Sequence, residues 1–230
     1  MKINKNMSVV GISILVFLLY FIWPYLIDNI MAYVNIDSSY YACLKFIWNF
    51  ILLFILLFIY RKYLKKDILD FKKNSSKYMI KGIKILVIGL VCYVFTNLLV
   101  SLLCSFGGNQ NDNFNVIYDT FKAMPMLLIL TTIIYYPIVE EIVFKKTFKD
   151  IISNKWLFVI ITGLLNAGFN MALSTSSSLS LLYIIPDSII SMSFSYIYYE
   201  TNNLTTSVLY RSLYNLIPNI AAILSFIVIM

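Results

Sequence analysis

At the centre of this chain stands the stretch Pro137-Ile-Val-Glu140-Glu141-Ile-Val-Phe144-Lys145-Lys146, which closes an apolar run that begins near Met124. A carboxylate at hydrocarbon depth costs roughly 3 kcal/mol on membrane-insertion scales. A chain that keeps two of them side by side normally pairs them or uses them. The remaining sequence is therefore interpreted by what it supplies around these two glutamates.

The composition defines the class of protein. The chain has 230 residues, of which 60% are apolar and 17% aromatic, and its mean hydropathy is +0.83. This indicates a polytopic membrane protein. Only helices or closed barrels satisfy backbone groups in lipid, and long apolar runs without alternation of period two indicate helices. The fold prediction is all-α, a transmembrane helix bundle of about seven spans.

The predicted spans follow from the apolar runs. They are residues 8–34, 41–60, 83–106, 124–144, 156–173, 179–198 and 204–230. The chain is divided into residues 1–123, with the first three spans and a basic loop, and residues 124–230, a core that carries polar residues inside its spans. Neither an internal repeat nor a long linker is visible in the sequence.

The net charge of +7 comes from basic residues in short loops beside the apolar spans. Loops 1–6, 61–84 and 145–155 hold 15 of the 18 basic residues, whereas the loops near Asp37, Asn111 and Ser176 hold almost none. This distribution is typical of the positive-inside rule and predicts a cytoplasmic N-terminus. The expected partner is the lipid bilayer, and no nucleic-acid partner is predicted.

The basic loop 61–84 has two interpretations. A charged cytoplasmic loop is sufficient to explain its nine lysines and arginines. The apolar residues Leu64, Ile68, Leu69 and Phe71 also permit an amphipathic helix on an anionic leaflet. The loop is the favoured prediction, and the helix stays open.

Cysteine and histidine usage narrows the chemistry. Cys43, Cys92 and Cys104 all lie in apolar stretches without a CxxC pattern, so they are interpreted as packing residues. The chain contains no histidine. That excludes a histidine-ligated zinc, a histidine general base and a Ser-His-Asp triad. No metal and no cofactor are predicted.

Polar residues recur inside the later spans. Asn166 and Asn170, like Arg211 and Asn215, are four residues apart and therefore share a helix face. Lys145 follows Glu141 by four residues, the favourable order for a helical ion pair. If these faces converge with Glu140, Glu141 and Asp187, they form one buried polar cluster. Such a cluster can be structural glue between helices or a functional site.

The order and spacing of these residues resemble the CPBP family, which comprises type II CAAX prenyl endopeptidases and bacteriocin-processing enzymes. Glu140-Glu141-Ile-Val-Phe144-Lys145 resembles the family motif E-E-x-x-x-R. Asn166 and Asn170 stand where the family has F-x-x-x-H, and Arg211-Ser-Leu-Tyr-Asn215 stands where it has H-x-x-x-N. The resemblance covers about residues 124–216 and implies a CPBP-like core.

The resemblance also implies a mechanism. In the family a glutamate activates water against a peptide bond inside a membrane cavity, while two histidines and the Asn position the water and stabilise the oxyanion. Here both histidine positions are changed, to Asn170 and Arg211. Arg211 is a permanent cation, and a carboxylate locked in an ion pair is a poor general base. Glu140, Glu141, Asn170, Arg211 and Asn215 are the candidate catalytic residues.

Three hypotheses remain. The first is a degenerate, non-proteolytic member of a bacterial cell membrane, which binds a peptide or membrane-protein partner in bacteriocin self-immunity or envelope regulation. The second is an active intramembrane glutamic endopeptidase that cleaves peptides or prenylated CAAX-type substrates. The third is a small transporter, favoured by Asp187 beside Pro186 in a possible broken helix. Phe144, Lys145, Asn166 and Asp187 are candidate substrate-contacting or structural residues.

Overall fold

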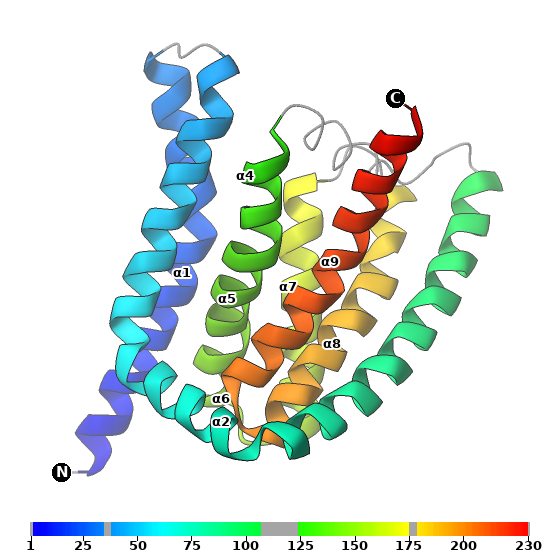
Figure 1. Cartoon of the computed structure of the whole chain (residues 1–230). Coiled ribbons are helices and arrows are strands. Elements are labelled where there is room, and N and C mark those ends of the chain that lie inside the picture. Colours follow the sequence, from blue (N-terminus) through cyan, green and yellow to red (C-terminus); the bar gives the residue numbers. More distant parts are fainter. Residues whose placement is uncertain (1, 35–37, 107–123, 175–178, 230) are drawn as a thin grey trace.

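The computed structural model describes residues 2–34, 38–106, 124–174 and 179–229. Every regular element in these ranges is a helix, and they pack as a bundle of roughly upright rods (Figure 1). The predicted all-α bundle is confirmed. The positions Asp37, Asn111 and Ser176, near which basic-poor loops were predicted, lie outside the described residues.

The first rod, α1 (Lys2–Val34), pairs with the first pass of α2 (Ser38–Phe106). The indoles of Trp23 and Trp48 stack with ring centroids 4.4 Å apart. Each indole N–H donates to the backbone carbonyl of the other residue, at 3.2 and 3.1 Å. These reciprocal bonds satisfy both indoles in an apolar setting and fix the two helices side by side.

The number of separate helices differs from the prediction. Six helical rods are present in the described residues instead of seven spans, because the predicted spans 41–60 and 83–106 belong to the single helix α2. The expected loop 61–84 is itself helical and runs across one end of the bundle (Figure 1). Only Asn74 departs from helical geometry (φ −116°, ψ 18°). We call residues 61–84 the elbow.

The elbow is helical because its inner face packs on α8 (Ile184–Thr201) and on the start of α9 (Leu204–Ile229). Buried and half-buried positions recur every three to four residues and include Tyr63, Asp67 and Tyr78. The Tyr63 hydroxyl lies 2.9 Å from that of Tyr198. The amphipathic-helix interpretation of the sequence is therefore the correct one for the backbone, and the loop prediction is wrong.

The glutamates lie on a composite rod in which ordinary and π-helical turns alternate. It comprises α4 (Pro125–Leu130), η1 (Thr131–Tyr135), α5 (Tyr136–Glu140), η2 (Glu141–Lys146) and α6 (Thr147–Lys149), where η1 and η2 are π-helical. The helix thus continues five residues beyond Phe144, into the stretch predicted as a loop. π-Helical turns are rare and concentrate at functional sites.

Three further helices complete the bundle. They are α7 (Lys155–Ser174), α8 (Ile184–Thr201), which the 3-10 turn η3 (Leu179–Tyr183) precedes, and α9 (Leu204–Ile229). Pro186 lies in the first turn of α8, where its missing N–H breaks no helical hydrogen bond. The helix that carries Asp187 is therefore not broken at Pro186.

Length and composition make five stretches of helix able to cross a membrane: 10–34, 43–104, 125–149, 155–172 and 181–201. α9 does not meet the same criterion over its described residues. Many large apolar side chains face outward, as in Leu15, Phe54 and Leu98. An outer surface of this kind suits lipid, so the chain is a multi-pass integral membrane protein.

Candidate functional site

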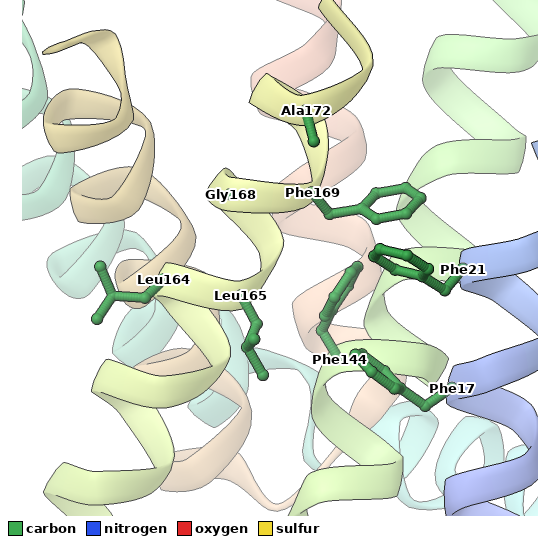
Figure 2. Close-up of a pocket in the computed structure, with 8 residues that line it drawn as sticks. All are labelled: Phe17, Phe21, Phe144, Leu164, Leu165, Gly168, Phe169 and Ala172. Atoms are coloured by element: carbon green, nitrogen blue, oxygen red, sulfur yellow. The ribbon is translucent and has the colours of Figure 1, made fainter. Parts of the chain in front are cut away.

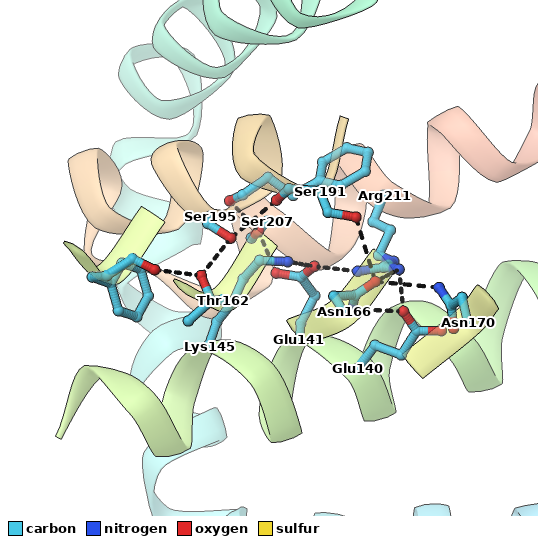
Figure 3. A network of polar contacts seen from close by, with 12 residues as sticks. Glu140, Glu141, Lys145, Thr162, Asn166, Asn170, Ser191, Ser195, Ser207 and Arg211 are labelled. Carbon is cyan, nitrogen blue, oxygen red and sulfur yellow. Dashed lines mark hydrogen bonds and ion pairs between the residues drawn. The ribbon is translucent and has the colours of Figure 1, made fainter. Parts of the chain in front are cut away.

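Four charged side chains meet in the interior between the composite rod and α9. Arg211 of α9 donates to Glu140 Oε2 through one terminal nitrogen and to Glu141 Oε1, at 3.3 Å, through the other. Lys145 donates to Glu141 Oε1, which is the predicted pair four residues apart. We call Glu140, Glu141, Lys145 and Arg211 the charged quartet (Figure 3).

The quartet is closed off from solvent and electrically balanced. Glu141 is fully buried, and Lys145, Glu140 and Arg211 are 1%, 2% and 6% exposed. Two carboxylates face two cations, so the net charge of the group is zero. Isolated buried ions are very costly, and only close pairing with satisfied hydrogen bonds offsets their desolvation.

Asn166 of α7 joins the quartet on the Glu140 side. Its amide nitrogen donates to Glu140 Oε2 at 2.9 Å, and its amide oxygen accepts from Arg211 at 3.0 Å. Asn170, one turn further along α7, donates to the same Asn166 oxygen at 3.2 Å.

Several small hydroxyls complete the cluster and were not singled out from the sequence. Ser207 of α9 donates to Glu141 Oε2, and Ser191 of α8 donates to the Asn166 oxygen at 3.4 Å. Thr162 donates to the hydroxyl of Ser195 at 2.8 Å. A signal was available: Ser207 precedes Arg211 by four residues, and Ser191 precedes Ser195 by four, so each pair shares a helix face.

Asn215 lies apart from the glutamates. Its amide donates to the backbone carbonyl of Thr132 at 2.7 Å, and the neighbouring Ser212 donates to the carbonyl of Ile133 at 2.9 Å. Both carbonyls belong to the π-helical turn η1, where the regular ladder of hydrogen bonds is interrupted. In this structure Asn215 fastens α9 to the composite rod, and its amide is not directed at the quartet.

Asp187 is not joined to the quartet either. It occupies the first turn of α8, where a negative charge is favoured by the helix dipole. No hydrogen bond or ion pair connects it to the cluster among the residues that the structure describes. The predicted convergence is therefore found for Glu140, Glu141, Asn166, Asn170 and Arg211, and Asp187 lies outside it.

Phe144 faces an apolar groove between α1, η2 and α7 (Figure 2). The groove has a volume of about 210 Å³ and is lined by Phe17, Phe21, Phe144, Leu164, Leu165, Gly168, Phe169 and Ala172. Phe144 and Phe169 lie 6.0 Å apart, centroid to centroid. Neither glutamate lines the groove, although Glu140 and Glu141 are one turn away from Phe144 on the same rod.

The donor set of the site does not favour a metal. Within the described ranges no group of three or more His, Cys, Asp or Glu side chains is placed to hold an ion. A cation at the two glutamates would also have to displace Arg211 and Lys145, which already neutralise them. The quartet thus keeps four charged side chains paired in the buried interior. The apolar groove lies beside it, at Phe144.

The structure thus places two adjacent glutamates inside a helical membrane bundle, where they contact polar side chains of α7 and α9. Residues 122–217 match the family described as type II CAAX prenyl endopeptidase Rce1-like. This match supports the resemblance to the CPBP family that the motifs indicate, over a part of the chain that lacks both motif histidines. The comparisons with curated proteins and with solved structures returned no match.

Proposed function

We propose that this protein is a non-proteolytic CPBP-family member that acts by binding a peptide or membrane-protein partner. The observation that carries the proposal is the charged quartet, in which the two glutamates of the family motif are both held by cations. The opposing possibility is an intramembrane glutamic endopeptidase in which Glu140 or Glu141 activates water.

The hydrogen bonds of Glu141 support the non-proteolytic alternative. One carboxylate oxygen accepts from Lys145 and Arg211, and the other accepts from Ser207. A general base has to present an oxygen to water and to take up a proton readily. A carboxylate that is buried, doubly ion-paired and hydrogen-bonded does neither. Asn170 and Asn215, the remaining oxyanion candidates, are bonded to Asn166 and to the Thr132 carbonyl.

The apolar groove supports the binding role. Aromatic and aliphatic side chains line it, and it lies where a hydrophobic segment within the bilayer would reach the rod that carries the glutamates. We assign the groove to an apolar peptide segment or to the transmembrane helix of a partner. By analogy with the family, such a role extends to bacteriocin self-immunity or the control of another envelope protein in a bacterial cell membrane.

The first test measures proteolysis. Purified wild-type protein and Glu141→Gln are incubated in liposomes with quenched fluorescent peptides, including prenylated CAAX-type ones. We expect no cleavage that depends on Glu141. Cleavage by the wild type that Glu141→Gln abolishes, at unchanged thermal stability, would establish the endopeptidase and refute the proposal.

The second test measures binding. A synthetic Leu/Ala-rich peptide, long enough to span a bilayer, is titrated into the protein in nanodiscs. Gly168→Leu places a side chain in the groove, and the matched control Gly11→Leu adds the same side chain at an exposed position with nothing within 4 Å. We expect Gly168→Leu to weaken binding roughly tenfold or more, and Gly11→Leu to leave it unchanged. Equal affinities of wild type and both variants for the peptide would show that the groove is not the binding site.

We also propose that the N-terminus and the elbow face the cytoplasm. The start of α1, the elbow and α6 lie at one end of the bundle (Figure 1), which gathers the basic segments on one side. A cysteine introduced at Lys72 in a cysteine-free background tests this. It should react with a membrane-impermeant maleimide only after cells are opened, and labelling of intact cells would reverse the orientation.

A further inference from the structure

The outer face of the elbow carries a dense and unpaired positive charge. Eight of its nine basic residues are exposed: Arg61, Lys62, Lys65, Lys66, Lys72, Lys73, Lys77 and Lys84. Only the ninth, Lys81, forms an ion pair among the described residues, with Glu200 at 2.7 Å. The charge of this face is therefore not balanced within the fold, in contrast to that of the quartet.

The basic residues are arranged as one stripe. Lys62, Lys66, Lys73, Lys77 and Lys84 follow one another at spacings of four or seven residues, which keeps them on one helix face. That face lies opposite the buried positions that pack on the bundle. Leu69 and Ile80 lie within the stripe and are 51% and 59% exposed.

The position of the elbow at one end of the bundle indicates which kind of anion its basic face would meet. The elbow joins the two passes of α2 and runs across one end of the bundle (Figure 1). For a bundle of helices that are able to cross a membrane, this end lies at the level of the lipid headgroups. Lipid phosphates occupy that level all around the protein. Lysine side chains are long enough to reach phosphates from a helix at the interface.

We propose that the outer face of the elbow is a binding surface for the headgroups of anionic phospholipids. The long basic stripe provides charge complementary to several phosphates at once. The elbow is fastened on its other side to the start of α9, because Asp67 accepts the Leu204 backbone N–H at 2.7 Å.

The test compares lipids of equal chain length in nanodiscs. The protein is exposed to mixtures of phosphatidylglycerol and phosphatidylcholine, and the lipids retained after extraction are counted by native mass spectrometry. We expect wild-type protein to prefer phosphatidylglycerol by roughly tenfold or more. The quadruple variant Lys62→Gln/Lys66→Gln/Lys73→Gln/Lys77→Gln should lose most of this preference, while Lys→Arg at the same four positions should keep it.

Three results would overturn the proposal. One is equal retention of the two lipids by wild-type protein, and another is a preference that the Gln variant retains in full. The third is binding of inorganic phosphate or polyglutamate without any preference for phosphatidylglycerol, which would assign the surface to a soluble anion or an acidic protein. Unfolding temperatures in pure phosphatidylcholine confirm that both variants are folded.

Discussion

The charged quartet and the outer face of the elbow use the same kinds of side chain in opposite ways. In the quartet every charge has an opposite charge beside it, and all four side chains are buried. On the elbow eight cations are exposed, with no carboxylate in ion-pair range among the described residues. Lysines and arginines of this chain thus occur in two settings: some neutralise buried carboxylates, and others form an exposed basic surface.

The comparison has an energetic basis. A buried ion pair contributes little net stability relative to apolar residues, but removal of one partner leaves an uncompensated charge in a dry interior. An exposed lysine loses little solvation on folding, and its removal changes little. Substitutions in the quartet should therefore be costly to the fold, and substitutions on the elbow should be costly only to binding.

The largest effect is expected for Arg211→Ala. This change leaves Glu140 and Glu141 with Lys145 as the only cation of the quartet, and we expect a loss of about 3–5 kcal/mol in unfolding free energy. Thermal and denaturant unfolding in detergent measure it. Glu141→Gln combined with Arg211→Ala should cost less than the sum of the two single changes. Additive costs would show that the two side chains are not coupled.

Ser207→Ala should have the next largest effect. The change removes the donor to Glu141 Oε2 and leaves that buried oxygen unbonded, so we expect a loss of roughly 1.5–3 kcal/mol. Ser193→Ala is the matched control, since the Ser193 hydroxyl donates to the Ile189 carbonyl of its own helix at 3.0 Å. If both alanine variants unfold alike, Ser207 has no special part in stabilising the quartet.

Asp67→Ala tests the attachment between the elbow and α9. Asp67 is 5% exposed and caps the first turn of α9, so its loss should cost about 0.5–2 kcal/mol. Asp67→Asn retains a side-chain oxygen that can accept the Leu204 N–H, and it should retain most of the stability. Hydrogen exchange at the start of α9 localises the change. Faster exchange elsewhere, with the start of α9 unaffected, would contradict the assigned role.

The smallest effect is expected for Lys72→Gln on the elbow. In detergent or neutral lipid its unfolding temperature should match that of wild type, because the side chain is exposed and unpaired. The identical substitution Lys145→Gln, in the quartet, should lower the unfolding temperature by several degrees. Similar shifts in unfolding temperature for the two variants would show that a buried, paired lysine and an exposed lysine contribute equally to stability.

The sequence predicted the helical bundle, the resemblance to the CPBP family and several of the polar residues that meet between the composite rod, α7 and α9. Glu140, Glu141, Asn166 and Arg211 could be identified because polar side chains are expensive inside apolar spans and because their spacing matches known motifs. Spacing determines which residues share a face, but not which neighbour that face meets. Asn215 shares a face with Arg211, yet it bonds to the Thr132 carbonyl, which is accessible because η1 is π-helical. Nothing in the local sequence predicts that turn.

The elbow was predicted as a loop for a different reason. Charge density and the lack of a long apolar run argued for a loop at 61–84, whereas packing of its inner face on the turn between α8 and α9 makes it helical. Asn203 of that turn donates to the Asp67 carbonyl at 2.8 Å and to Asp70 at 3.1 Å. These contacts join residues more than 130 positions apart, so the sequence of the segment alone does not identify its packing partner.

The electrical balance of the quartet restricts how this interior can change over evolutionary time. Exchange of Arg211 for a neutral residue, or loss of either carboxylate, leaves an unbalanced charge in the buried interior. A histidine at position 211 would preserve the balance only in its protonated, cationic form, and a neutral histidine would require a second, compensating substitution. Substitutions at the four positions are therefore expected to depend on one another.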